Sequence, residues 1–493
     1  MTDTARYALI VLLASAVGLV AVLSNRLTER VKIPVPLLVL VGAAVTVKIV
    51  PGLHAPPERT VERVVTVALV LILFDGGMHI GWARFRAAAA PIVVVGVLGT
   101  FLTAAGGAVL LHLAFGVSWY LALLVATAVA PTDPAVVFSV LGQREVSGRS
   151  GTILEGESGA NDPVGIALMA SLLAAGRLSG GTFASVGGEF VLQMVLGAVI
   201  GIVAGRALLG FMRRVPLPSE GLYPLRTLAS ALMLYGIATL AHGSGFLAVF
   251  IAGIVIGDGR APYKREIERF HSALAGLAEI VAFTVLGLTI DLSVLARVDV
   301  WIPGLVLGVV LAVVIRPLLV GLCLVPARLR RNERAFVLFA GLKGAVPILL
   351  GELLRVAQVP DAERLYGIVV VVVIFSVLAQ GSLVPTVARL LHLPMRTVEP
   401  EPWVFGARLR DEPGGVHRLR VTAGSAADGR TIDNVSDLVG DIWISIVVRD
   451  RQLVPVRAGT ELQAEDEVVV LADPHLHDTL TTMFSSPQAP SGQ

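Results

Sequence analysis

The sequence predicts an all-α polytopic membrane protein with about thirteen transmembrane helices, followed by a small α/β domain. Two observations place most of the chain in a membrane. The 493 residues are 55% hydrophobic and only 15% charged, with a mean hydropathy of +0.80, whereas soluble domains average about 25% charged residues. Apolar runs of about 20 residues, the length that spans a bilayer as a helix, recur up to residue 392. Beyond that position, short alternating runs are typical of a soluble domain.

The predicted helices occupy residues 7–25, 33–50, 62–80, 89–115, 119–142, 152–176, 186–212, 224–242, 244–258, 272–291, 300–326, 334–355 and 364–391. The first run could be taken for a secretory signal. However, it is long, has only Arg6 as a basic flank and is followed by further apolar runs. We therefore interpret it as a retained transmembrane helix.

Basic residues predict the orientation of these helices. Loops that follow odd-numbered helices hold nineteen Lys and Arg residues, and the loops on the other side hold seven. Cytoplasmic loops carry the excess of basic residues. We therefore expect a multi-pass protein of the cell membrane, with its amino terminus outside and its carboxyl terminus in the cytoplasm. An odd number of helices is what this arrangement requires.

The remaining chain predicts a linker, a domain and a tail. The transmembrane part is expected to cover residues 1–392, a Pro- and Arg-rich linker 393–415, a small domain 416–484 and a disordered tail 485–493. Within the domain we predict strands at 417–422, 443–449, 452–456 and 467–471, and a short helix at 478–484.

Several classes of function lack support in the sequence. There is no P-loop, no HExxH and no CxxC motif, so no cofactor is expected. Cys323 is the only cysteine, which excludes an intramolecular disulfide. The net charge of +2 favours no particular partner, and no nucleic-acid partner is expected.

Charged residues inside the apolar runs are the strongest functional signal. Each costs about 2.5–3.5 kcal/mol near the centre of a membrane helix, and they therefore require a function or internal pairing. For any one of them a structural ion pair is an equally good explanation, but the neighbouring sequence is also unusual. The residues are Asp75, Asp133, Glu157, Asp162, Arg316 and Lys343, with Glu155 and Glu279 as further candidates.

The run at 119–142 contains Pro131-Thr132-Asp133-Pro134. Each proline removes an amide donor and clashes with the preceding turn, so the helix is predicted to break. Broken backbone survives at membrane depth only where it is buried in protein or lines a wet cavity. Carbonyl groups beside a carboxylate would form an oxygen-rich site suited to a hard cation.

The next run places polar groups where they can meet Asp133. Ser158 and Asp162 are four residues apart and share one helix face, and Glu157 and Asn161 share the adjacent face. Asp162 is therefore expected to approach Asp133, with the hydroxyl of Ser158 beside it. Two neighbouring carboxylates do not both ionise easily. Protons and a cation would then compete for one site, which is sufficient for coupled exchange.

A second interruption is predicted at 341–347, where Gly341, Gly344 and Pro347 surround Lys343. It lies seven helices after the first, which suggests inverted repeats of helices 4–6 and 11–13, and paired interrupted helices indicate a substrate site. We expect Lys343 to pair with Glu157, with snorkelling to the interface as the alternative. Arg316 is expected to brace the core.

Asp75 keeps two interpretations. It lies late in the run at 62–80 and could bind or admit ions, or it could face outside water at a helix end.

These motifs together resemble the cation:proton antiporter-1 family, in particular the NhaP-type sodium or potassium/proton antiporters. The resemblance covers about residues 7–391 and rests on the segments 73–77, 131–134, 157–163, 278–291 and 341–347. It implies a thirteen-helix fold with a dimer domain and a moving six-helix core, and hence a homodimer. The family usually has arginine where this chain has Lys343, and glutamate where it has Asp75.

The resemblance also implies roles for individual residues. The backbone of Thr132 and the side chains of Asp133, Ser158 and Asp162 would bind the monovalent cation, with Asp75 near it. Asn161, the residue before Asp162, would mark electroneutral exchange. Glu157 would pair with the basic residue at position 343.

The tail resembles the TrkA-C (RCK-C) type of regulatory domain, through residues 424–425, 428–432, 449–450, 454–455 and 465–468. Such domains commonly dimerise and can bind a small regulatory ligand, and their association with potassium transport favours potassium over sodium.

The function that follows is electroneutral potassium (or sodium)/proton antiport by alternating access, regulated by the cytosolic domain. A regulated potassium channel is one alternative, but no Thr-Val-Gly-Tyr-Gly-like filter is present. A membrane-embedded enzyme is another, but the apolar runs hold no nucleophile–base pair.

Overall fold

The structure is a computed structural model. It describes residues 34–50, 55–141, 144–146, 149–177, 182–327, 329–393, 395–397, 415–439, 442–450 and 452–485, together with Leu19. The chain forms two compact units, Met1–Pro402 and Trp403–Gln493. Except for Leu19, the predicted helix at 7–25 lies outside the described residues, as do most of the predicted linker and tail.

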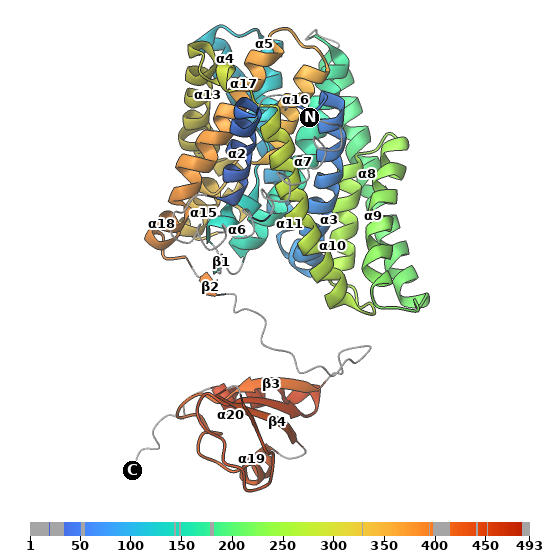
Figure 1. The fold of residues 1–493 in the computed structure, drawn as a ribbon, viewed down its shortest axis with the longest axis vertical. Helices are drawn as coiled ribbons and strands as arrows, with labels where there is room; N and C mark the ends of the chain where they lie inside the picture. Colours follow the sequence, from blue (N-terminus) through green and yellow to red (C-terminus); the bar gives the residue numbers. More distant parts are fainter. Residues whose placement is uncertain are drawn as a thin grey trace. The chain divides into compact units, whose positions relative to one another are not determined.

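The first unit is helical (Figure 1). In chain order its helices are α2 (Val35–Ile49), α3 (Glu58–Val93), α4 (Thr100–Phe115), α5 (Trp119–Ala128), α6 (Pro134–Leu141), α7 (Arg149–Ala175), α8 (Thr182–Arg214), α9 (Leu222–Leu240) and α10 (Gly245–Gly257). They continue with α11 (Lys264–Leu288), α12 (Leu292–Leu295), α13 (Val298–Val310), α14 (Gly321–Cys323), α15 (Arg331–Phe339), α16 (Ala345–Val356), α17 (Ala362–Phe375) and α18 (Ser382–Leu390). Two short strands, β1 (Arg144–Val146) and β2 (Met395–Thr397), pair antiparallel.

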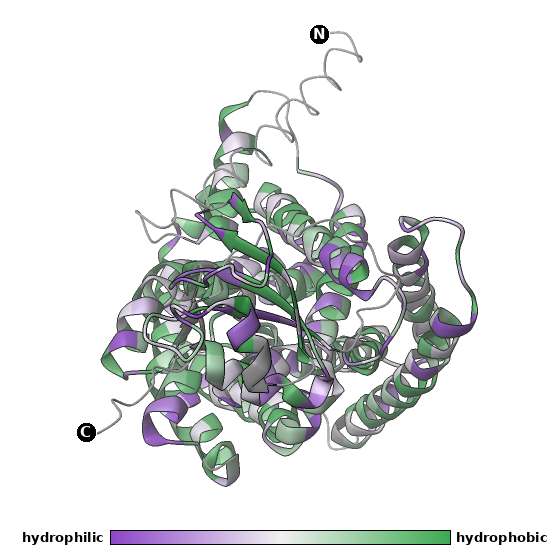
Figure 2. Cartoon of the chain, turned by 90° about the horizontal axis from the view of Figure 1, so that it is seen from below, coloured by the Kyte–Doolittle hydropathy of each residue, from purple (hydrophilic) through white to green (hydrophobic). Residues whose placement is uncertain are grey.

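Several of these helices are long and apolar enough to cross a membrane. Within the described residues five stretches meet that standard by length and composition, namely Glu58–Phe115, Ala184–Arg214, Lys264–Leu288, Val298–Cys323 and Ala362–Leu390. Large apolar side chains on α8 and α9 are exposed, including Val203 (62%) and Leu240 (85%). Figure 2 shows that hydrophobic residues dominate these helices. This surface suits lipid rather than water, and the chain is a multi-pass membrane protein.

Three π-helical segments lie within the long helices. Val94–Gly99 joins α3 to α4, Leu311–Val320 joins α13 to α14, and Ser376–Gly381 joins α17 to α18. Such segments shift the register of a helix by one residue and often occur at functional sites.

Two helices are interrupted where prolines and glycines predict a break. The first interruption, residues 129–133, separates α5 from α6, and the second interruption, residues 340–344, separates α15 from α16. Both predicted interruptions are confirmed.

The predicted boundary between 62–80 and 89–115 is confirmed as a kink. Two helices meet at Gly81, whose φ of 64° is accessible to glycine, and the second helix begins there rather than at residue 89. The side chain of Asp258 accepts a hydrogen bond from the amide of Ala83, just after the change of direction. A single glycine with a capping carboxylate therefore replaces the expected loop.

The second unit contains a four-stranded antiparallel sheet of order β3-β6-β4-β5. The strands are β3 (Val416–Arg420), β4 (Trp443–Arg449), β5 (Gln452–Val454) and β6 (Glu467–Leu471), and the helices are α19 (Ile432–Val439) and α20 (His477–Ser485). Alternation along the strands buries Val447, Val468 and Val470 in one core with Leu480 and Phe484 of α20. The predicted strands and carboxyl-terminal helix are confirmed.

Candidate functional site

The two interruptions meet each other inside the helical unit. The amide of Asp133 donates a hydrogen bond to the carbonyl of Leu342 over 2.8 Å. In return, Nζ of Lys343 donates to the carbonyls of Ala130 (2.8 Å) and Pro131 (3.1 Å). Backbone groups that the prolines free are thus satisfied by the other interruption instead of by water. This crossing places irregular backbone from two distant segments at one point.

Thr132 attaches the first interruption to α7. Its amide donates to Oδ1 of Asn161 over 3.3 Å, and its Oγ1 accepts from Nδ2 of Asn161 over 2.7 Å. Its carbonyl accepts from Oγ of Ser158 over 2.6 Å. All three residues are buried, with 2–5% of their surface exposed. Asp162 lies four residues beyond Ser158, on the same face of α7.

Asp162 is a buried carboxylate for which the described residues show no hydrogen-bond donor. It is 8% exposed, and none of the hydrogen bonds found between described residues reaches its side chain. The charged residues that act on it electrostatically are Asp133 and Lys343. Asp133 is thus close enough to Asp162 to act on its charge, and the prediction that both bind one ion stays a prediction. Asp133 itself lies against Gly344, where a Cβ would overlap its carboxylate.

The expected pair of Glu157 with Lys343 is wrong, because Arg316 is the partner of Glu157. Nη1 and Nη2 of Arg316 contact the two carboxylate oxygens over 2.8 and 3.0 Å. The same guanidinium donates to the carbonyls of Leu338 (Nε, 2.9 Å) and Val337 (Nη2, 3.2 Å). A planar guanidinium fits this two-pronged arrangement and an ammonium does not. Arg316 thus ties α7 to α15 through contacts that suit its predicted bracing role.

Lys343 serves a different purpose from the one predicted. It is 5% exposed, so it does not snorkel to the interface. Its ammonium has three donors, and two of them satisfy the carbonyls of Ala130 and Pro131. The sequence had suggested such carbonyls as cation ligands, whereas in the structure these two accept hydrogen bonds from Lys343.

Asp75 makes its contacts away from the crossing. Its Oδ1 accepts from Oγ of Ser272 on α11 over 3.1 Å, and its Oδ2 lies 3.4 Å from Nδ1 of His79. Within the described part of the chain no contact of Asp75 with the crossing residues is found. Its side chain is 14% exposed, and its role as an ion ligand stays a prediction.

Sequence reasoning missed Ser376 and Gln380 near the crossing, and it named Glu279 only as a further candidate. Both missed residues are buried: Ser376 bonds the amide of Lys343 in the second interruption, and Gln380 bonds the carbonyl of Phe339 just before it. Glu279 on α11 interacts electrostatically with Asp133, and its buried Oε1 has no hydrogen-bond partner among the described residues. The available signal was the same as for Asp133: a polar side chain within a strongly apolar run.

The chain is similar to proteins of a known family. The family described as "Sodium/hydrogen exchanger, transmembrane" matches residues 13–390. A protein of Alkalimonas amylolytica named K(+)/H(+) antiporter NhaP is 34% identical over 390 residues, which cover 78% of this chain and 67% of that protein. The K(+)/H(+) antiporter NhaP2 of Shewanella oneidensis is 31% identical over 494 residues, covering 97% of this chain and 83% of the relative.

A solved structure shares the fold. The sodium proton antiporter MjNhaP1 from Methanocaldococcus jannaschii, determined at pH 8, superposes with a TM-score of 0.63 over 76% of this chain and 99% of its own. Because the sequences are only 21% identical, this likeness concerns the fold alone.

Proposed function

Because the chain belongs to the sodium/hydrogen exchanger family, we propose that it is an antiporter that exchanges K⁺ or Na⁺ for H⁺ across the membrane. The observation that carries this proposal is Asp162. A carboxylate that is 8% exposed and receives no hydrogen bond from a described residue is costly as a bare charge. Either a proton or a cation would remove that cost, and the two would compete for the same oxygens.

The cation would be held by oxygen ligands from both sides of the crossing. Asp133 and Asp162 supply carboxylates, Thr132 its carbonyl and Ser158 its hydroxyl. The hydroxyl of Ser158 now donates to the Thr132 carbonyl over 2.6 Å, so both oxygens are next to each other. If the hydroxyl proton turned away, both could face one ion. Alternating access of this single site to the two sides of the membrane would then couple the two fluxes.

Asn161 supports electroneutral exchange. It stands beside Asp162 and uses its amide to hold Thr132, so it adds no second carboxylate at this turn of α7. A site that carries equal charge in its cation-loaded and proton-loaded forms moves no net charge per cycle.

The decisive experiment is the substitution Asp162→Asn in proteoliposomes that contain a pH-sensitive dye. We expect cation-induced dequenching to vanish, because the amide neither binds nor releases a proton. The matched control is Asp291→Asn at the exposed start of α12, where the side chain only caps the helix through Ser293. Wild-type exchange by Asp162→Asn would refute the proposal.

The choice between potassium and sodium is a separate proposal. We favour K⁺, because the relatives from Alkalimonas and Shewanella are named K(+)/H(+) antiporters and because the tail resembles a TrkA-C domain. The test compares Li⁺, Na⁺, K⁺ and Rb⁺ in the same dye assay, and a response to Na⁺ and Li⁺ without one to K⁺ would exclude this choice.

Three further features stay proposals. We infer that the protein is a homodimer, that its carboxyl terminus is cytoplasmic, and that residues 416–484 bind a small regulatory ligand. Cross-linking tests the homodimer. Labelling of a cysteine introduced into the tail, in oriented vesicles, tests the orientation. Ligand-dependent exchange rates test the regulatory ligand.

A further inference from the structure

Two polar side chains stand one turn apart in the last apolar stretch of the helical unit, Ala362–Leu390. Ser376 and Gln380 lie in the π-helical segment Ser376–Gly381, which continues α17. They are 3% and 6% exposed, so neither faces lipid. Polar groups buried at membrane depth need hydrogen-bond partners, and the identity of those partners indicates what the pair does.

Their partners belong to the second interruption and to the residue before it. The hydroxyl of Ser376 accepts a hydrogen bond from the backbone amide of Lys343 over 3.0 Å. It also donates to Oε1 of Gln380 over 3.3 Å, and Nε2 of Gln380 donates to the carbonyl of Phe339. The pair therefore bridges both ends of the unwound stretch, from the last residue of α15 to Lys343.

The stretch depends on these bonds because it has lost most of its helical ones. Residues 340–344 are not helical. The amide of Ala340 still bonds the i−4 carbonyl of Phe336, but the amide of Leu342 bonds the carbonyl of Ala340 and that of Lys343 bonds Ser376. Leu342 offers its carbonyl to Asp133. Lys343, the next residue, sends Nζ to Ala130 and Pro131. The hydrogen bond to the amide of Lys343 therefore fixes the backbone from which Leu342 and Lys343 contact the first interruption.

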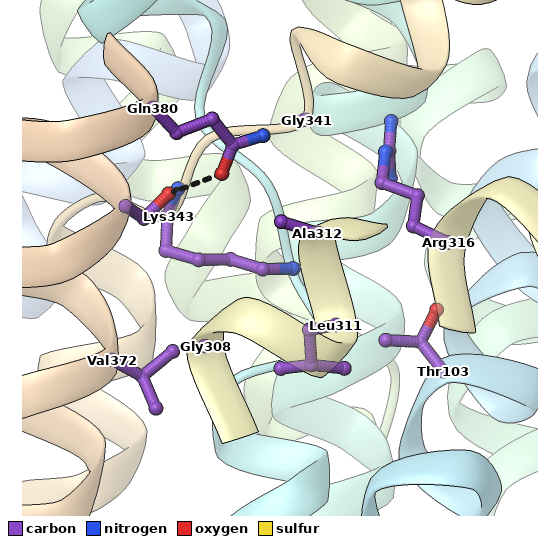
Figure 3. A pocket seen from close by; sticks show the side chains of 10 residues that line it. Thr103, Gly308, Leu311, Ala312, Arg316, Gly341, Lys343, Val372 and Gln380 are labelled. Atoms are coloured by element: carbon purple, nitrogen blue, oxygen red, sulfur yellow. Dashed lines mark hydrogen bonds between the residues drawn. The ribbon is translucent and has the colours of Figure 1, made fainter. Parts of the chain in front are cut away.

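The same pair lines a pocket with the two buried cations. Its lining includes Ser376, Gln380, Lys343 and Arg316. Figure 3 shows Gln380 and Lys343 on one side of it and Arg316 on the other. The π-helical turn directs Ser376 and Gln380 toward this interior space.

We propose that Ser376 and Gln380 are positioning residues for exchange: they hold the second interruption so that Lys343 and Leu342 keep the first interruption in its ion-binding geometry. Their hydrogen bonds within the described part of the chain go to Lys343, to each other and to Phe339. The inference rests on the proposed function for its transport readout, and on the hydrogen bonds alone for its structural readout.

The structural readout is hydrogen–deuterium exchange of the full-length protein in detergent. Gln380→Met keeps the length of the side chain but removes its donor and acceptor, and Ser376→Ala removes the hydroxyl. We expect both to speed amide exchange at residues 339–344. The control is Ser382→Ala, whose hydroxyl bonds only the nearby Ala379 carbonyl. Unchanged protection at 339–344 in both variants would overturn the proposal.

The transport readout separates positioning from mere stabilisation. We expect Gln380→Met and Ser376→Ala to raise the apparent KM for the cation ~10-fold, the loss expected for one buried hydrogen bond, with a smaller effect on the maximal rate. Ser376→Thr, which keeps the hydroxyl, should restore a near-normal KM. An unchanged KM with only a lower melting temperature would contradict positioning.

The two readouts distinguish a failure of the proposed antiport from a failure of the positioning role. If the wild-type protein exchanges no cation but the variants still loosen residues 339–344, the proposed function fails and the structural role stands.

Discussion

Gly344 lies so close to Asp133 that any side chain at this position would overlap the carboxylate. The position therefore requires space, because a Cβ would overlap the Asp133 carboxylate. The carboxylate can therefore stand beside the second interruption only because a hydrogen atom faces it. At the scale of single residues, the site thus depends on the missing side chain of Gly344 as well as on the carboxylate of Asp133.

We expect Gly344→Ala to abolish exchange. The added methyl group has to displace either Asp133 or the backbone, and a shift of about 1 Å at a binding site costs on the order of 100-fold in rate. The dye assay measures the rate. Gly276→Ala in α11 is the control, since a Cβ there meets nothing within 4 Å. Normal exchange by Gly344→Ala would show that Asp133 has room to move.

Arg316→Gln should destabilise the protein by about 3–5 kcal/mol, because it leaves Glu157 as a buried charge without its partner. Glu157 is 2% exposed and its side chain has the guanidinium on both oxygens. The double variant Arg316→Gln with Glu157→Gln should recover part of that loss. Thermal unfolding in detergent measures all three proteins, and equal melting temperatures of the single and double variants would contradict the pairing.

At the scale of elements, charged residues tie helix ends together. Arg355 near the end of α16 contacts Glu352 one turn earlier (3.1 Å), Glu363 on α17 (3.0 Å) and Glu58 at the start of α3 (3.5 Å). Glu352 has no exposed side-chain surface. This cluster joins three helices that are far apart in the sequence, and the predicted helix boundaries contained no sign of it.

In the sheet of the second unit, Arg449 at the end of β4 holds Asp466 just before β6 through two hydrogen bonds of 2.8 and 2.7 Å. Burial of the Asp466 carboxyl opposes ionisation, but the bonds from Arg449 and from the amide of Gln463 outweigh it, and the pKa of Asp466 lies below its usual value. Ionised Asp466 thus stabilises the folded sheet at neutral pH.

Acidification should therefore weaken this sheet. The contribution of a carboxyl with a lowered pKa is present above its unfolded pKa of about 3.9 and is lost as the pH falls through the folded value. We expect amide protection of β4 and β6 in the full-length protein to drop below about pH 4. Asp466→Asn should lower protection at pH 7 and lose this part of the acid dependence. The same acid profile in wild type and variant would assign the effect to other groups.

At the scale of the whole molecule, the helical unit and the small sheet unit each have their own hydrophobic core. The residues of the crossing all belong to Met1–Pro402. We therefore expect a chain truncated after residue 402 to fold and to retain exchange in proteoliposomes, with any ligand-dependent regulation lost. A folded truncated protein without exchange would show that the second unit is part of the transport machinery.

Electroneutral exchange also belongs to this scale, because membrane potential acts on the complete cycle. A net charge that crosses the membrane is coupled at about 2.3 kcal/mol per 100 mV. With equal K⁺ on both sides and Na⁺ as the test cation, we expect the same exchange rate with valinomycin, which clamps the potential at zero, and without it. A rate that rises when valinomycin is added would contradict the role of Asn161.

Local chemistry determined much of this protein from sequence alone. The prolines at 131 and 134 and the glycines at 341 and 344 predict both interruptions, because a missing donor and a missing Cβ act wherever they occur. The spacing of Ser158 and Asp162 predicts their common face by helix geometry alone. The strands of the second unit follow from their alternation in the same way.

Only the tertiary structure decided which charges meet. Glu157 lies 159 residues from Arg316, and no local pattern distinguishes Arg316 from Lys343 as its partner. The choice follows from packing: the π-helical turn brings the guanidinium to α7, whereas the crossing puts the ammonium of Lys343 beside the carbonyls of Ala130 and Pro131. Helix periodicity sets the direction of a side chain, but the distance to a partner depends on how the helices pack.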